Sequence, residues 1–443
     1  WDGTSEKQWN SPADKDIRSF PIPVTEIASR EVGVYRCKNM AAIGALSNLL
    51  HIDYSIIESV IQEKTSKKGS HVLEKNLLAF KLGFDYAETL KTGSVPCHLS
   101  PIGKSEKLIL SGNEALALGA LMSGCRFCAA YPITPATDLM EWLALELPGV
   151  GGTVIQAEDE ISALEMVLGA SFAGRKAFTA TSGPGLSLMA ELIGMASMAE
   201  IPSVIVDVQR GGPSTGMPTK TEQSDLNLAL YGTHGDAPRI VLAPTNVEDC
   251  FFQIINAFNL SEKYQVPVIV LSDQSLGHRK ESMRRPVMAD IKQSERLRPK
   301  ADEIKDYRRY GLTSTGVSPM AIPGESEGYY VAQGLEHDEY GAPCYDPENH
   351  LRMTAKRFCK LQDISGDITL FERYGKQDAR IGIIGWGSTE GAVREAFEKL
   401  DAEGYGIEVF YPKVLNPLPD KEIRNFLKNK KARSEERRVG KEC

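Results

Sequence analysis

The stretch Thr153–Gly185, TVIQAEDEISALEMVLGASFAGRKAFTATSGPG, decides the fold class of this chain. It begins with an apolar strand candidate, residues 153–157, and continues as a helix candidate, residues 159–173, with apolar residues at helical spacing. A second apolar strand candidate, residues 176–181, follows. Because a strand, a helix and a strand in this order are the unit from which parallel sheets are built, the stretch predicts an α/β fold.

The alternation of strands and helices continues on both sides of this stretch. Further strand candidates span residues 126–131, 201–208, 240–242 and 266–271, and further helix candidates span residues 113–122, 187–199 and 247–264. Such alternation is typical of a doubly wound parallel sheet, in which ligands bind where the strands end. We therefore expect the functional residues to follow the strands directly.

The remaining parts of the chain differ in character from this central domain. Amphipathic segments before residue 100 predict a separate helical module, and a strand, a helix and a strand after residue 380 predict the start of a second α/β domain. We expect a helical module with a linker at 1–100, the parallel-sheet domain at 101–282, an irregular connection at 283–379, a truncated second α/β domain at 380–432 and a non-native tail at 433–443.

Composition narrows the class of protein. Of the 443 residues, 42% are hydrophobic and 25% are charged, which is typical of a globular enzyme, and the net charge of −8 argues against a nucleic-acid partner. No apolar run is long enough to span a membrane, and the eight scattered cysteines predict a reducing cytoplasm. Cys125 and Cys128 form a CxxC without a second pair, so we expect buried structural thiols and assign no metal ligand to this chain.

Two motifs place polar groups beside strand ends. Residues 131–137, YPITPAT, hold Thr134 between two prolines that restrict the backbone, although a capping turn with Thr137 or Asp138 as the N-cap is the simpler explanation. Residues 156–160, QAEDE, end in Glu160, which is in helical register with the apolar stripe that follows. A carboxyl group there needs a partner, such as a ligand nitrogen, unless it turns outward into water.

Two further motifs follow the next strands. Residues 181–185, TSGPG, turn from a strand into a helix whose free N–H groups can meet a ligand, although a tight connection also explains them. Residues 209–220, QRGGPSTGMPTK, place Arg210 at a strand end before a loop rich in glycine and hydroxyl groups. Arginine suits the bidentate capture of a carboxylate, whereas a solvated surface arginine is the alternative.

Together these four motifs resemble the alpha subunit of the 2-oxoacid:ferredoxin oxidoreductases. The resemblance implies a thiamine diphosphate whose pyrimidine ring nitrogen is bound by Glu160, with Thr134 near the reacting carbon and Arg210 at the substrate carboxylate. It also implies cofactor contacts from Pro132, Ile133, Ser182 and Gly183 and substrate contacts from Ser214, Thr215 and Thr219.

The same resemblance implies a reaction and its partners. The family carries out CoA-dependent oxidative decarboxylation of a 2-oxo acid and passes the electrons to ferredoxin. The chain has no Gly-Asp-Gly motif for the diphosphate, so a beta subunit is expected to bring Mg²⁺, the diphosphate site and a 4Fe-4S cluster, in a hetero-oligomer of alpha–beta pairs. Residues 37–90 resemble the end of a fused gamma module, and the second α/β domain resembles a transketolase C-terminal domain, so we expect a chain truncated at both ends.

The substrate and two other functions stay open at this point. The loop at residues 212–220 resembles the 2-oxoglutarate members, and pyruvate, a branched-chain 2-oxo acid or indolepyruvate are the alternatives. A non-catalytic scaffold with a thiamine-type fold is argued against by Thr134, Glu160 and Arg210 together. A Rossmann-type nucleotide site at residues 385–391 lacks a full GxGxxG.

Overall fold

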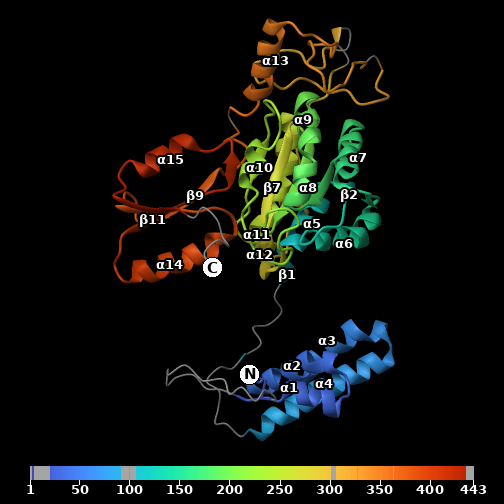
Figure 1. Ribbon diagram of the computed structural model, residues 1–443, viewed down its shortest axis with the longest axis vertical. Coiled ribbons are helices and arrows are strands. Elements are labelled where there is room, and N and C mark those ends of the chain that lie inside the picture. The colour runs from blue at the N-terminus through green and yellow to red at the C-terminus, as the bar shows by residue number, and fades with distance from the viewer. Residues whose placement is uncertain are drawn as a thin grey trace. The chain divides into compact units, whose positions relative to one another are not determined.

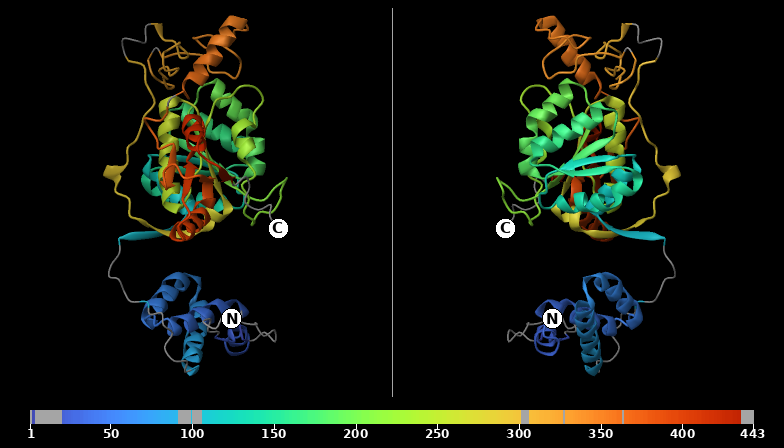
Figure 2. Two further views of the ribbon diagram at one scale, coloured as in Figure 1. Left: turned by 90° about the vertical axis from the view of Figure 1, so that its left-hand side faces the viewer. Right: turned by 90° about the vertical axis from the view of Figure 1, so that its right-hand side faces the viewer.

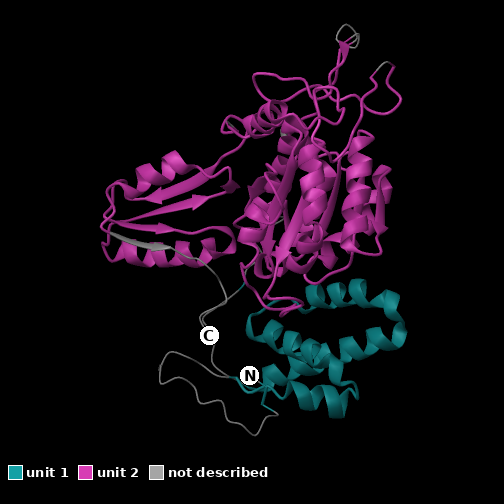
Figure 3. Cartoon of the chain, turned by 45° about the horizontal axis from the view of Figure 1, so that its top comes forward, with its two compact units in different colours: residues 1–105 teal, residues 106–443 magenta. Residues whose placement is uncertain are grey.

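The chain is described here from a computed structural model, in which it forms two compact units, residues 1–105 and 106–443 (Figure 3). The division falls close to the boundary expected at residue 100. The structure describes residues 2–3, 20–90, 99, 106–300, 306–326, 328–362 and 364–435.

The first unit is helical. Its three long helices are α2 (Lys38–Leu49), α3 (Tyr54–Thr65) and α4 (Ser70–Thr89), and its short turns are α1 (Val24–Glu26), η1 (Ile27–Glu31), η2 (Tyr35–Cys37) and η3 (Ser66–Lys68). Helices α2 and α4 cross at glycines: a Cβ atom on Gly44 would lie 1.9 Å from the Phe80 carbonyl oxygen, and one on Gly83 would lie 1.9 Å from that of Ala41. The absence of side chains at these two positions therefore permits the close approach.

A sheet of seven strands forms the centre of the second unit (Figure 1). Its order is β12-β6-β7-β5-β4-β2-β3, and every pair is parallel except β12 with β6. The strands are β2 (Phe127–Ala130), β3 (Thr153–Gln156), β4 (Ala177–Thr181), β5 (Ser203–Gln209), β6 (Ile240–Leu242), β7 (Pro267–Asp273) and β12 (Val414–Asn416). The predicted α/β fold with a parallel sheet is confirmed, whereas the short strand β12 was not expected from the sequence.

Helices cover both faces of this sheet and enclose two separate cores. One core joins the sheet to α5 (Gly112–Met122), α6 (Thr137–Glu146) and α11 (Val247–Tyr264), and the other joins it to α7 (Glu160–Phe172), α9 (Ala190–Met198) and α10 (Leu226–Tyr231). The helix expected at residues 187–199 is two helices, because α8 (Gly183–Leu188) begins at the TSGPG turn and Met189 separates it from α9. Burial on both faces explains why the strands are apolar throughout.

Two smaller sheets complete the unit. Strands β1 (Lys107–Ser111) and β8 (Lys280–Arg284) pair antiparallel, and α12 (Gln274–His278) leads into β8. The second α/β sheet has the order β13-β10-β11-β9, with β9 (Phe371–Gly375), β10 (Ile381–Ile384), β11 (Ile407–Pro412) and β13 (Ala432–Glu435), and it is accompanied by α14 (Glu390–Ala402) and α15 (Asp420–Leu427). This sheet begins before residue 380 and includes the first three residues of the tail that we expected to be non-native, while residues 436–443 lie outside the described part.

The connection between the two α/β parts has little regular structure, as expected, apart from α13 (Pro347–Cys359), η5 (Met288–Asp290) and β9. Helix α13 and the loops around it extend together beyond one end of the large sheet (Figures 1 and 2). None of the helices in the described ranges is long and apolar enough to cross a membrane.

Glu200 anchors this connection to the large sheet. It follows α9, is fully buried, and its carboxylate accepts hydrogen bonds from Lys356 Nζ at 2.7 and 2.8 Å and pairs with Lys360. Its carbonyl oxygen accepts a hydrogen bond from Arg309 at 2.7 Å. Burial alone would raise the pKa of Glu200, but the positive charges of Lys360, Lys356 and Arg309 hold this pKa well below its usual range.

Replacing Glu200 should therefore destabilise the second unit strongly. The change Glu200→Gln leaves two buried lysines without a counter-ion, and we expect the free energy of unfolding to fall by about 3–5 kcal/mol. The measurement is urea denaturation, with Glu165→Gln as the control, because Glu165 is exposed on α7 and should change stability by less than about 0.5 kcal/mol. Equal effects from the two variants would contradict this role of Glu200.

Candidate active site

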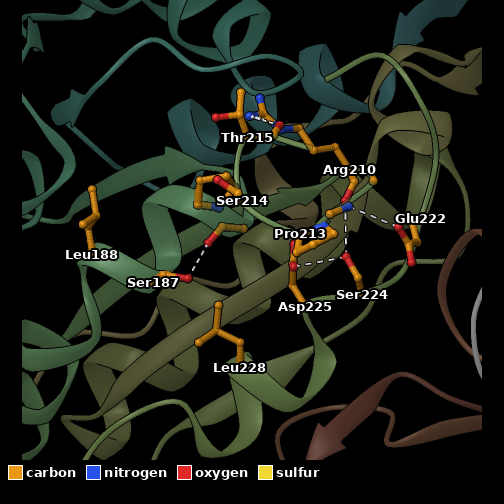
Figure 4. A pocket seen from close by; sticks show the side chains of 14 residues that line it. Ser187, Leu188, Arg210, Pro213, Ser214, Thr215, Glu222, Ser224, Asp225 and Leu228 are labelled. Carbon is orange, nitrogen blue, oxygen red and sulfur yellow. Dashed lines mark hydrogen bonds between the residues drawn. The ribbon is translucent and has the colours of Figure 1, made fainter. Parts of the chain in front are cut away.

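A pocket of about 760 Å³ lies where β4 and β5 end (Figure 4). The start of α8, the loop that follows Arg210 and the segment that leads into α10 form its walls. Its lining residues are Gly183, Pro184, Ser187, Leu188, Arg210, Gly211, Gly212, Pro213, Ser214, Thr215, Glu222, Ser224, Asp225 and Leu228. Two of the four motifs therefore meet in this pocket, as the parallel sheet predicts.

Arg210 is a buried part of the pocket wall. The side chain is only 6% exposed, which excludes the solvated surface position. It donates hydrogen bonds to the carbonyl oxygens of Thr134 and Thr215, the latter at 2.9 Å, and its Nε is buried without a partner. Among the residues that the structure describes, no carboxylate lies within 4 Å of this guanidinium. Because a buried cation without a counter-ion is costly, an anionic ligand suits this position.

Thr134 lies beside the pocket through its backbone. Its carbonyl oxygen binds Arg210, which joins the YPITPAT turn to the loop at Thr215. The side chain of Thr134 is exposed, whereas Pro132 and Ile133 are half-buried, and none of these three lines the pocket. Helix α6 has Ala136 as its N-cap without a side-chain hydrogen bond, so the capping explanation for this motif is not supported.

Glu160 begins α7 and does not turn outward into water. The residue is 6% exposed, and Asp159 serves instead as the N-cap by accepting a hydrogen bond from the Ser162 N–H at 2.7 Å. Within the described ranges the Glu160 carboxylate has no hydrogen-bond or ion-pair partner. A Cβ atom on Gly185 would lie 2.7 Å from Glu160 Oε1 and 2.1 Å from Thr181 Oγ1. The carboxyl group therefore packs directly on the TSGPG turn.

The other face of the same turn meets a second carboxyl group. A Cβ atom on Gly183 would lie 2.6 and 2.7 Å from the two carboxyl oxygens of Asp225. The hydroxyl of Ser182 is buried without a hydrogen-bond partner in the described structure. The TSGPG turn is thus more than a tight connection, because its two glycines make room for Glu160 on one side and Asp225 on the other.

The loop after Arg210 contributes unequally to the site. Ser214 and Thr215 line the pocket, while Thr219 is exposed and does not. Sequence reasoning missed Glu222, Ser224 and Asp225, which lie in a polar run, TEQSD, without strand or helix periodicity. Glu222 accepts a hydrogen bond from the Gly212 N–H at 3.1 Å and so fixes the glycine-rich loop.

The remaining sequence features have structural explanations. Cys125 and Cys128 are fully buried, and burial raises the pKa of Cys125 to about 12, so these thiols are unsuited to ligation or nucleophilic attack. At residues 385–391, Gly387 has φ +65° and lies in the turn between β10 and α14. A Cβ atom there would lie 2.5 Å from Gln223 Nε2, so the glycine allows this close contact.

Comparison with known proteins identifies the protein family to which the chain belongs. Residues 118–356 match the family model described as "Pyruvate flavodoxin/ferredoxin oxidoreductase, thiamine diP-bdg", and residues 3–86 match the model "Pyruvate ferredoxin/flavodoxin oxidoreductase". Residues 118–356 therefore have the fold of a thiamine-diphosphate-binding domain. The chain belongs to the 2-oxoacid:ferredoxin oxidoreductase family, as an alpha subunit, and the resemblance found in the four motifs is confirmed.

Individual relatives agree with this assignment. The 2-oxoglutarate synthase subunit KorA of Methanothermobacter marburgensis is 42% identical over 325 residues, which cover 72% of this chain and 84% of the relative. The 2-oxoacid:ferredoxin oxidoreductase subunit alpha of Saccharolobus solfataricus is 38% identical over 448 residues, covering 94% of this chain and 68% of the relative. A solved 2-oxoglutarate:ferredoxin oxidoreductase from Magnetococcus marinus, with 2-oxoglutarate, coenzyme A and succinyl-CoA bound, superposes with a TM-score of 0.89 at 44% identity, covering 98% of this chain and 76% of that one.

The residues of this chain fit one half of a thiamine diphosphate site. A pyrimidine ring needs a carboxyl group for its nitrogen. Glu160 is buried and has no hydrogen-bond or ion-pair partner among the described residues, and the buried Gly185 lets the turn lie directly against it. The hydroxyl of Ser182, also buried without a partner in the described part of the chain, adds a polar group to the same turn.

A methyl group at Gly185 should disturb this site. In Gly185→Ala the new Cβ atom would overlap Thr181 Oγ1 and displace the Glu160 carboxyl, so we expect thiamine diphosphate binding to weaken at least roughly tenfold and stability to fall by about 1–3 kcal/mol. Titration of the cofactor into the assembled enzyme and thermal unfolding measure the two effects. Gly194→Ala is the matched control, because its Cβ atom would meet nothing within 4 Å. Unchanged cofactor affinity in Gly185→Ala would contradict the proposed place of Glu160.

Proposed function

We propose that this chain supplies the pyrimidine side of the active site of an enzyme that converts 2-oxoglutarate and coenzyme A to succinyl-CoA and CO₂. The choice of substrate rests on the buried guanidinium of Arg210, which lines the pocket and has no carboxylate partner among the described residues. Two of its five N–H groups bind backbone carbonyl oxygens, and in the described part of the chain the other three are available for a substrate carboxylate. The relatives named for 2-oxoglutarate, with 40–42% identity, support the choice of this acid.

The residues of this chain have different roles in the proposed reaction. When bound, thiamine diphosphate supplies the carbon nucleophile for the 2-oxo carbon and the electron sink for decarboxylation. Glu160 holds a proton at the pyrimidine nitrogen and so helps to activate the cofactor. Arg210 orients the substrate carboxylate, and Thr134, Ser214, Thr215 and Thr219 are proposed to contact the substrate. Pro132, Ile133, Ser182 and Gly183 are proposed to contact the cofactor.

The proposed enzyme also needs a beta subunit and ferredoxin as partners. A beta subunit would bring the diphosphate site with its Mg²⁺ and a 4Fe-4S cluster, because the chain has no Gly-Asp-Gly motif for this purpose. Electrons would then leave to ferredoxin. We propose a hetero-oligomer of alpha–beta pairs in the cytoplasm, in keeping with the unpaired cysteines Cys125, Cys128 and Cys250 of the second unit.

A panel of 2-oxo acids tests this function directly. The chain is coexpressed with its beta subunit, and CoA-dependent reduction of a dye is followed with 2-oxoglutarate, pyruvate, a branched-chain 2-oxo acid and indolepyruvate. We expect turnover only when both subunits are present, and a preference for 2-oxoglutarate of at least roughly tenfold in kcat/KM. A preference for pyruvate would overturn the substrate, and turnover by the alpha chain alone would overturn the need for a beta subunit.

Glu160→Gln should nearly abolish this activity. The amide has the same shape but cannot exchange the proton, so we expect kcat to fall roughly 100-fold or more while the fold is retained. The control is Glu158→Gln, because Glu158 is exposed two residues earlier and should change kcat by less than about twofold. Comparable losses in the two variants would show that Glu160 is not the carboxylate that serves the cofactor.

A further inference from the structure

We propose that Asp207 and Asp225 share one proton and act as a positioning pair, which keeps the wall of the substrate pocket from carrying two adjacent negative charges. The proposal rests on the proposed function, because an anionic 2-oxo acid is the ligand that a second charge would repel. Nothing in the family resemblance or in the comparisons assigns either aspartate.

Asp207 is a carboxyl group inside an apolar strand. It lies in β5, whose other inner residues Val204, Ile205, Val206 and Val208 are aliphatic, and it is fully buried. Its neighbours in the sheet are Thr181 on β4 and Leu271 on β7. Burial of a carboxylate there would be costly without a partner.

Asp225, in the wall of the pocket, has the carboxyl group that pairs with Asp207. It precedes α10 and lines the pocket, and its carboxyl group lies close enough to that of Asp207 for a hydrogen bond if one of the two is protonated. Its backbone N–H donates to Gln209 Oε1 at 3.1 Å, and the Ser224 hydroxyl lies 3.3 Å from Asp225 Oδ1. The same carboxyl group packs against Gly183. Asp225 thus connects the end of β5, the TSGPG turn and the pocket.

The number of donors shows that the pair needs a proton. In the described structure neither oxygen of Asp207 receives a hydrogen bond from a protein N–H or from a hydroxyl group, and Asp225 Oδ2 receives none either. Two ionised carboxylates can only accept, so their contact is repulsive unless one of them is protonated. A single shared proton converts this repulsion into a hydrogen bond, as it does in other carboxyl pairs.

Burial and the nearby charges also favour a protonated carboxyl group in this pair. Burial, followed by the charge of Asp225, raises the pKa of Asp207 well above its usual range. The pKa of Asp225 is raised to about 6, mainly by burial; its contacts with Ser224 and Asp207 oppose the rise, the charge of Glu222 adds to it and that of Arg210 opposes it. The groups that face the pair are therefore Glu222 and Arg210 in the pocket wall, with Glu160 on the far side of the glycine turn.

The shared proton should make binding of the substrate depend on pH. Because burial raises the pKa of Asp207, the shared proton is held to a higher pH than on an ordinary aspartate and is lost as the pH rises through the raised pKa. A second negative charge then appears in the wall of the pocket that Arg210 also lines. We expect the KM for 2-oxoglutarate to rise roughly tenfold over this range, while kcat changes less.

Infrared spectroscopy tests the shared proton without using activity. A protonated carboxyl group gives a carbonyl-stretch band that an ionised one lacks, and we expect this band in the wild-type chain between about pH 7 and 8. It should be lost in Asp207→Asn and in Asp225→Asn but retained in Glu222→Gln, a matched carboxyl variant in the same wall. A wild-type chain without the band would overturn the proposal even if neither variant folds, and so would a band that survives in both aspartate variants.

Steady-state kinetics of the alpha–beta complex at saturating CoA tests the effect on the substrate. The amide of Asp207→Asn can donate a hydrogen bond to Asp225 but cannot ionise, so its KM for 2-oxoglutarate should stay within about twofold across the range in which the wild-type KM rises. A purely structural role would lower kcat at every pH and leave the profile unchanged, and this outcome, like a flat wild-type profile, would overturn the pair's role. A complex that turns over none of the 2-oxo acids would contradict the proposed function, and the infrared measurement would still decide the pair.

Discussion

The close contact of two carboxyl groups with the two glycines of the TSGPG turn is the constraint on which the site depends. Glu160 packs on Gly185 and Asp225 packs on Gly183, so one short turn separates the carboxylate proposed for the cofactor from the carboxyl pair in the pocket wall. A methyl group at either glycine would occupy the space of an oxygen atom. The parallel sheet makes this possible, because β4 delivers the turn at the same edge where β5 delivers Arg210.

Arg210 also connects two loops at the edge of the pocket. Its hydrogen bonds to the carbonyl oxygens of Thr134 and Thr215 connect two loops whose bonded residues are 81 positions apart in the sequence. A guanidinium group suits this role because its donors point in several fixed directions and its charge persists at every relevant pH. The same residue therefore shapes the pocket and leaves donors free for an anion.

Buried ionic groups outside the pocket fix the irregular connection in a similar way. Lys356 and Lys360, at α13 and its end, converge with Arg309 on Glu200. Such a cluster fixes the orientation of the segments more closely than apolar packing does. Each charged group needs an oppositely charged partner at hydrogen-bonding distance and in a suitable direction. It holds a segment without regular hydrogen-bonded structure against the end of α9.

The sequence by itself determined the fold class, the order of the strands and helices in the central domain, and four motifs at the carboxyl ends of strands. These features are local, since apolar periodicity and turn residues act over a few positions. Only the tertiary structure decided which motif residues meet. It buried Arg210 beside Asp225, left Thr134 and Thr219 at the surface, and added β12 to the sheet from a segment more than 100 residues away. The physical reason is that a shared proton, a close glycine contact or a buried charge depends on neighbours distant in sequence, and no local pattern records them.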